Sequence, residues 1–179
     1  AASDVYKRQV PHEIFSSCAG AAIYRKSVFD KIGLFDESFF AYLEDMDIGY
    51  RARLAGYRNL YNPYAKVYHL GSASSGSRHN AFKVELSARN SMWMLRKNMP
   101  VWQLILNIPF IAAGIVIKTV YFAKKGLVTA YLKGIIKGLS SKLRNTSKNA
   151  GEKHKDTGFA TYLGLQMWLF RGMIKRVKK

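Results

Sequence analysis

The sequence predicts an α/β block followed by a mainly α-helical tail that is basic and amphipathic. The first observation is the pattern of apolar residues, which come in short runs broken by Gly or Asn-Pro up to residue 69 and at helical spacing later. The second is charge: residues 1–77 hold 9 Lys/Arg against 8 Asp/Glu, whereas residues 78–179 hold 20 against 3. We assign residues 10–98 to the α/β block and residues 99–179 to a membrane-associating helical tail.

The expected elements follow from local spacing and from helix-ending residues. In the block they are a buried strand over 14–24 packed around Gly20, a short helix over 27–32 capped by Ser27 and ended by Gly33, a helix over 44–55 ended by Gly56, short strands over 57–61 and 65–69, and a helix over 81–97. In the tail they are an uncharged stretch over 99–117, a helix over 127–143, a polar linker over 144–157 and an amphipathic helix over 159–179. Residues 1–9 (AASDVYKRQ) have neither a signal-peptide core nor apolar periodicity, so we expect a non-native leader there.

The composition narrows the class of protein. The 179 residues suffice for one core, and 49% hydrophobic residues are too many for a disordered chain. A net charge of +18, held almost wholly by the second half, points to an anionic partner, either nucleic acid or an acidic lipid surface. Cys18 is the only cysteine, which excludes an intrachain disulfide and a cysteine-based metal cluster.

The sharpest local feature is a group of three carboxylates, Glu44, Asp45 and Asp47, at the start of the expected helix over 44–55. One interpretation is structural, because free N–H groups and the helix dipole stabilise acidic side chains there. The other is chemical: one carboxylate takes a proton from a hydroxyl while another orients a cation or a sugar. Spacing alone does not separate the two.

Several short motifs follow one another over residues 18–90. They are Ala19-Gly20-Ala21-Ala22 with Tyr24-Arg25, Gly33-Leu34-Phe35-Asp36-Glu37-Ser38-Phe39-Phe40, Glu44-Asp45 with Asp47, Gly49-Tyr50-Arg51-Ala52-Arg53, Gly56-Tyr57, Val67-Tyr68-His69 and Arg89-Asn90. In this order they resemble family 2 glycosyltransferases of GT-A fold, particularly the rhamnosyltransferase-like bacterial members. The resemblance implies that the block is the C-terminal, acceptor-side half of a GT-A domain.

The resemblance also implies a reaction, in which a sugar passes with inversion from a nucleotide-sugar donor to a glycan or lipid-linked saccharide during cell-surface polysaccharide synthesis. Asp45 falls where the family has its general base, with Glu44 beside it. His69 falls where the family has a histidine that binds a divalent ion, Mn²⁺ or Mg²⁺, which neutralises the leaving diphosphate. Apart from the resemblance, a lone histidine at a strand end is more often structural than a metal ligand.

Six further residues are predicted to bind substrate: Gly20, Ala21, Asp47, Arg51, Arg53 and Arg89. Tight strand packing explains the small residues equally well. Ion pairs with the helix carboxylates are the favoured explanation of Arg51 and Arg53, and Asp47 and Arg51 are predicted to pair because they are four residues apart on the helix. The loop over 71–77 is either a lid over the donor or a plain surface loop. The family's nucleotide-binding half, with its Asp-x-Asp motif, would precede Gly20. No such motif stands there, so we expect a fragment that does not turn over by itself.

The predicted location of the protein at a membrane is based on the tail. The stretch 99–117 reaches the length of a spanning helix, but Pro100, Gln103, Asn107 and Pro109 interrupt it. A spanning helix, an interfacial or re-entrant arrangement, and a bundle with a solvated basic face all remain open. We expect binding to the anionic, cytoplasmic face of the cell membrane. Nucleic acid is not an expected partner, because no nucleic-acid motif appears. The alternative function is an inactive membrane anchor or interaction module.

Overall fold

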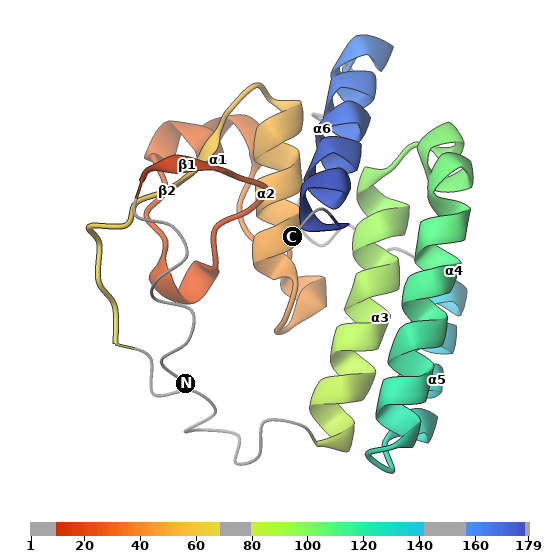
Figure 1. The fold of residues 1–179 in the computed structure, drawn as a ribbon. Helices are drawn as coiled ribbons and strands as arrows, with labels where there is room; N and C mark the ends of the chain where they lie inside the picture. Colours follow the sequence, from red (N-terminus) through yellow and green to blue (C-terminus); the bar gives the residue numbers. More distant parts are fainter. Residues whose placement is uncertain (1–9, 69–79, 142–156, 178–179) are drawn as a thin grey trace.

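The computed structural model describes residues 10–68, 80–141 and 157–177, and in it a small α/β part lies beside a group of long helices (Figure 1). The elements in chain order are β1 (His12–Ile14), η1 (Ala19–Ala21), α1 (Lys26–Ile32), η2 (Glu37–Phe39), α2 (Glu44–Leu54), β2 (Asn59–Tyr61), α3 (Ala81–Asn98), α4 (Val101–Ala123), α5 (Val128–Ser140) and α6 (Phe159–Val177). Helix α2 lies between the short strands and α3, so it joins the two parts.

The sheet is smaller than the sequence predicted. Strand β1 pairs antiparallel with β2, with His12 opposite Tyr61 and Ile14 opposite Asn59. The predicted strand over 14–24 is wrong beyond Ile14, because in the described part of the chain no further strand offers a hydrogen-bond ladder there. The backbone turns instead into η1, where the N–H of Ala21 donates to the carbonyl of Cys18 at 2.9 Å. A sheet of two strands neither confirms nor contradicts the GT-A half, which stays a prediction.

Two other expectations for this part need correction. Gly20 is exposed, and a Cβ built on it would meet no atom within 4 Å, so it does not pack tightly. Residues 65–68 form no strand and are exposed, while residue 69 lies outside the described residues. Ser27 is not the cap of α1, because Arg25 occupies that position and makes no side-chain capping bond.

The helices of the block agree well with the sequence. Helix α1 ends at Gly33, whose φ of 79° lies in the left-handed region that glycine tolerates best. Helix α2 begins at Glu44 and ends one residue before the predicted limit, with Gly56 at φ 87° beyond it. The two helices share a core of Val28 and Ile32 against Ile48 and Ala52.

Helices α3 and α5 approach each other closely. A Cβ on Gly138 of α5 would lie 2.5 Å from the carbonyl oxygen of Arg89 and 2.7 Å from the Cβ of Met92, both on α3. Gly134 lies one turn earlier and is crowded in the same way by the backbone of Glu85. The two glycines therefore let the backbones meet, as small residues four apart do in membrane helix pairs.

Helix α4 has an inverted distribution of polarity. Its buried residues are the polar Gln103 and Asn107, whereas most of its large apolar side chains face outward. The exposed ones are Val101, Ile105, Leu106, Ile108, Phe110, Val116, Ile117, Val120 and Tyr121. Pro109 lies inside the helix without ending it. By length and composition α4 is the one helix among the described residues that is able to cross a membrane.

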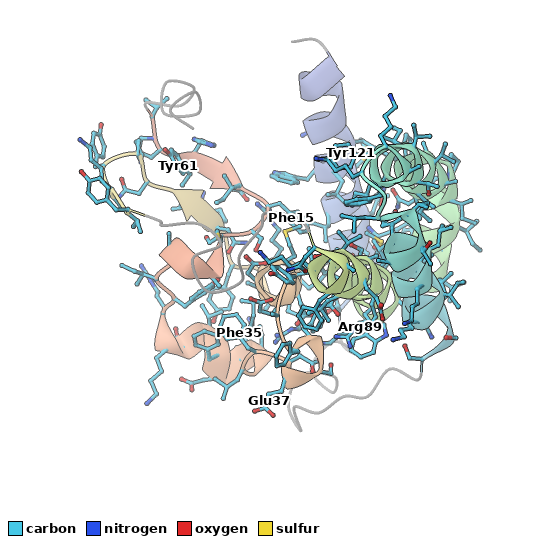
Figure 2. The ribbon with its side chains drawn as sticks, turned by 90° about the horizontal axis from the view of Figure 1, so that it is seen from below. Phe15, Phe35, Glu37, Tyr61, Arg89 and Tyr121 are labelled. Carbon is cyan, nitrogen blue, oxygen red and sulfur yellow. The ribbon has the colours of Figure 1, made fainter. Side chains whose placement is uncertain are left out.

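Helix α6 is tied to α4 and α2. The Gln166 side chain accepts hydrogen bonds from Gln103 and from Asn107, each at 2.8 Å, and the Tyr50 hydroxyl of α2 donates to Gln103, also at 2.8 Å. Phe15 lies where the N-terminal segment meets these helices (Figure 2), with its ring 5.8 Å from that of Trp168. The segments predicted over 142–156 and at the last two residues lie outside the described residues.

Candidate active site

The Asp45 carboxylate lies in the first turn of α2 and is held by two backbone donors. Its Oδ1 accepts from the N–H of Met46 at 2.8 Å, and its Oδ2 accepts from the N–H of Ala19 at 3.2 Å. The side chain remains partly exposed. The carboxylate is therefore fixed in orientation while it stays reachable for a hydroxyl group from outside.

Gly49 explains why the segment before η1 comes so close to α2. A Cβ on Gly49 would lie only 2.9 Å from the Cα of Ser16 and closer still to its side chain. The Ser16 hydroxyl in turn donates to the Asp45 carbonyl at 2.5 Å. The position of Ala19 over Asp45 thus depends on a glycine one turn along the helix.

Two buried polar atoms near Asp45 make no hydrogen bond within the described residues: Oε2 of Glu44 and the Tyr24 hydroxyl. Burial raises the pKa of Tyr24, and the charges of Asp45, Cys18 and Glu44 raise it further, in that order. Asp45, Cys18 and Glu44 therefore each lie within electrostatic reach of Tyr24 at the junction of η1 and α2. We call Cys18, Tyr24, Glu44 and Asp45 the Asp45 site.

The loop that leads into α2 is strained. Phe40, Tyr42 and Leu43 have φ of 62°, 68° and 70°, a conformation that costs a residue with a side chain about 1–3 kcal/mol. Asn90 on α3 holds this loop, because its buried Nδ2 lies within hydrogen-bond distance of three loop carbonyls at 2.7–2.9 Å. Backbone strain of this kind gathers at functional sites.

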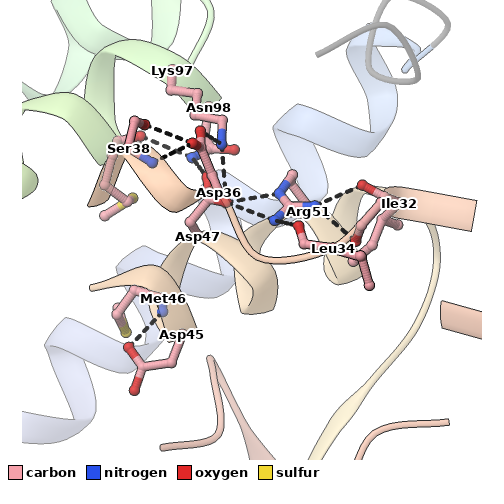
Figure 3. A network of polar contacts seen from close by, with 12 residues as sticks. Ile32, Leu34, Asp36, Ser38, Asp45, Met46, Asp47, Arg51, Lys97 and Asn98 are labelled. Atoms are coloured by element: carbon pink, nitrogen blue, oxygen red, sulfur yellow. Dashed lines mark hydrogen bonds and ion pairs between the residues drawn. The ribbon is translucent and has the colours of Figure 1, made fainter. Parts of the chain in front are cut away.

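Asp47 lies on the inner side of α2 in a closed network, apart from Asp45 (Figure 3). It has no exposed surface, and its carboxylate contacts Arg51 at 2.8 Å, Lys97 at 3.1 Å and Asn98 at 2.8 Å. Lys97 also contacts the buried Asp36 at 2.6 Å. The predicted pair of Asp47 with Arg51 is confirmed. The substrate role of Asp47 stays a prediction, and its contacts favour a structural role.

The predicted arginines are occupied by internal partners. Arg51 is fully buried and also donates to the carbonyl of Ile32 at 2.6 Å. Arg53 pairs with Glu13 at 2.9 Å, and its guanidinium lies over the Trp168 ring. Arg51 thus follows the structural interpretation, whereas the ion-pair partner of Arg53 is a carboxylate of β1 and not one of the helix carboxylates that we expected.

Arg89 binds the loop before α2, next to Asn90. Its guanidinium donates to the carbonyls of Ser38 and Phe39 at 3.2 and 3.1 Å and lies over the Trp93 ring (Figure 2). Burial lowers its pKa. It therefore supports the position of the loop, while binding of substrate by Arg89 remains untested.

Gly20 and Ala21 are both exposed in η1, directly after the residue that touches Asp45. They leave open space beside the Asp45 site, so a role toward substrate stays a prediction. The predicted metal ligand, His69, lies outside the described residues. In residues 10–68, 80–141 and 157–177, no three His, Cys, Asp or Glu side chains gather closely enough to hold a metal ion.

Sequence reasoning missed the part that Tyr24 and Asn90 play. Both belong to motifs that carried the resemblance, yet neither was expected at the site. Because Arg89 was a predicted site residue, its neighbour Asn90 could have been considered as well. The three carbonyls within hydrogen-bond distance of Asn90 lie far away in the sequence, so the sequence did not indicate the contact.

Comparisons with known proteins agree in part with the motifs. A stretch of 79 residues is 35% identical to N-acetylglucosaminyl-diphospho-decaprenol L-rhamnosyltransferase of two Mycobacterium tuberculosis strains, covering 40% of this chain and 26% of that protein. A stretch of 80 residues is 31% identical to the uncharacterised protein y4gI of Sinorhizobium fredii, covering 44% of this chain and 9% of that protein. No family model and no solved structure gives a significant match.

The chain thus spans about a quarter of the length of the rhamnosyltransferase that it matches. The similarity supports a glycosyltransferase relationship at the level of class for the matched stretch.

Proposed function

We propose that this chain is the acceptor-side part of an inverting glycosyltransferase that moves a sugar from a nucleotide-sugar donor to a glycan or lipid-linked saccharide in cell-surface polysaccharide synthesis. The observation that carries the proposal is the Asp45 carboxylate, held by two backbone N–H groups yet partly exposed. The similarity of a 79-residue stretch to a rhamnosyltransferase supports the reaction class.

In the proposed reaction Asp45 is the general base. As the acceptor hydroxyl oxygen forms its bond to the anomeric carbon of the donor, its proton passes to the Asp45 carboxylate. The bond from that carbon to the diphosphate breaks on the opposite face, so the configuration inverts. A general base contributes about 10²–10⁴-fold to such a step. The unpartnered Oε2 of Glu44 and hydroxyl of Tyr24 are suited to further polar groups of the acceptor.

The metal requirement remains a separate prediction. The described residues do not by themselves fit a divalent ion, since they bring no three suitable ligands together. The dependence on Mn²⁺ or Mg²⁺ rests on His69 and on a donor-binding part, so no step above passes through a metal.

We further propose that helices α4 and α6 hold the protein at the cytoplasmic, anionic face of a membrane. Helix α4 buries two polar side chains and exposes its apolar ones, which is the reverse of a helix on the surface of a soluble protein. The aromatic pair Phe110 and Phe170, with ring centres 5.7 Å apart, joins the two helices. Lys124 and Lys125 follow the end of α4, where they suit acidic headgroups.

The test uses the longest reading frame that contains this chain. Release of nucleoside diphosphate is measured from a panel of nucleotide-sugars, with Mn²⁺ and a membrane extract as the source of acceptor. We expect Asp45→Asn to lower the acceptor-dependent rate about 10²–10⁴-fold. The matched control is Asp30→Asn, since Asp30 is an exposed aspartate of α1 that is not one of the residues of the Asp45 site. An Asp45→Asn protein as active as wild type would refute the assignment of the base.

The alternative is an inactive anchor or interaction module, which the exposed apolar surface of α4 also favours. It predicts no release from any donor, together with vesicle binding that survives high salt because it depends on apolar insertion.

A further inference from the structure

An apolar pocket lies between α3, α4 and α5 and reaches the residue before Glu44. Its volume is about 220 Å³, and its lining is almost entirely apolar, including Leu43, Met92 and Ile115. A second hollow of about 180 Å³ shares three lining residues with it, Ser91, Lys118 and Tyr131. Because they share these residues the two hollows lie side by side, and we call them together the apolar channel, which begins next to the start of α2.

Among the described residues, Lys118 is the only charged one that lines either hollow. It is exposed, so the pocket opens to the surface at this point. Apolar walls with one cation at the mouth complement a hydrocarbon chain that ends in an anionic group. Because 220 Å³ falls below the roughly 300–1,000 Å³ of sites for compact drug-sized ligands, the pocket suits a slender chain.

We propose that this channel binds the hydrocarbon chain of a polyprenyl-phosphate-linked acceptor, with Lys118 on its phosphate. The proposal rests on the proposed function, because it names the part of the protein that holds the acceptor lipid. Leu43 and Lys118 line the same pocket, and Asp45 follows Leu43 by two residues. The bound lipid chain therefore lies next to the loop that leads into α2.

The experiment measures binding and needs no turnover. The full 179-residue chain in detergent micelles is incubated with farnesyl phosphate that carries a diazirine at its hydrocarbon end, then irradiated, and the labelled peptides are identified by mass spectrometry. Farnesol and phosphatidylglycerol are the competitors. We expect labels on α3, α4 or α5 at the pocket, with competition strongest from unlabelled farnesyl phosphate.

Two variants test the two halves of the proposal. Gly114 lines the pocket and a Cβ there meets nothing within 4 Å, so Gly114→Leu fills the space and also favours the helix. We expect at least tenfold less labelling, with Ala113→Leu, an exposed neighbour outside the lining, as control. Lys118→Gln is expected to weaken the binding of farnesyl phosphate about tenfold and that of farnesol hardly at all. The control is Lys133→Gln, because Lys133 is an exposed lysine of α5 that lines neither hollow.

Equal competition by phosphatidylglycerol overturns the proposal, since the channel would then be an ordinary lipid contact. Undiminished labelling of Gly114→Leu overturns it as well. Should Gly114→Leu misfold, Lys118→Gln provides the test, because Lys118 is exposed. If this variant loses binding of farnesol and of farnesyl phosphate equally, or loses neither, the role of the lysine is refuted. If the longer protein releases nucleoside diphosphate but this chain does not bind the lipid, this inference alone is refuted. If the chain binds the lipid but no nucleoside diphosphate is released, the proposed function alone is refuted.

Discussion

Replacement of Asp47 by Asn tests whether the three carboxylates of α2 divide into a structural one and a chemical one. Asn keeps the size of the side chain and one oxygen acceptor but removes the negative charge. Asp47 and Arg51 are both fully buried, and Lys97 is nearly so. Lys97 keeps its 2.6 Å contact with Asp36 in the variant, so Arg51 is the cation that loses its carboxylate.

The expected cost follows from that single uncompensated charge. Removing one partner of a buried ion pair costs about 3–5 kcal/mol. For a chain of this length the midpoint of thermal unfolding falls by about 2–4 °C per kcal/mol, which gives a decrease of about 6–20 °C. Asp45→Asn should cost about 1 kcal/mol or less, because its partners are neutral N–H groups that an amide oxygen still accepts from.

The assay is thermal and urea unfolding of the 179-residue chain, followed by circular dichroism in one detergent, for wild type, Asp47→Asn and Asp45→Asn. We expect a large loss of stability for the first variant and a small one for the second. An Asp47→Asn protein that unfolds within about 2 °C of wild type would refute the structural assignment. Asp47 would then be available for the substrate role that the sequence suggested.

Three more predictions follow from the packing. Gly138→Leu places a side chain where a Cβ already lies 2.5 Å from the backbone of Arg89, so α5 must move and the urea midpoint should fall by the equivalent of about 1–3 kcal/mol. Asn90→Ala leaves the loop carbonyls of Ala41 and Tyr42 without their donor, while that of Phe39 keeps Arg89, which should cost about 2–4 kcal/mol in urea unfolding and lower the activity of the longer protein. Burial raises the pKa of Tyr50 well above 10.0 in the folded protein. The neutral Tyr50 side chain therefore contributes its full stabilisation below pH 10.0. This contribution is lost as pH rises further, because the tyrosine ionises more easily in the unfolded chain. Unfolding followed from pH 9 to 11 should show a shallower alkaline loss in Tyr50→Phe, and an unchanged slope would contradict this.

Local signals predicted the helices of the block well. The limits of α2 and the pair of Asp47 with Arg51 depend on residues four apart or fewer, and the stops at Gly33 and Gly56 depend on one residue each. Such features are encoded where they occur, so spacing and glycine preferences suffice to locate them.

The prediction of a strand over 14–24 was wrong beyond Ile14 because a strand is defined by its partner. The small apolar residues there fit a strand locally, but the described chain offers only β2 to pair with, and that pairing stops at Ile14. The role of Asn90 was missed for the same reason. Its carbonyl partners lie about 50 residues away, and no residue near Asn90 in the sequence indicates which carbonyls they are.

The polar residues of α4 take on a different meaning once their partners are known. In the sequence, Gln103 and Asn107 weakened the case for a spanning helix. In the structure both are turned inward onto Gln166, and Gln103 also accepts from Tyr50 of α2. An amide placed in hydrocarbon without a partner costs several kcal/mol, so in a bilayer α4 would keep this face toward α6 and α2. The membrane helices and the helix that carries Asp45 would then hold a fixed orientation to each other, and the lipid surface would set the direction from which an acceptor reaches Asp45.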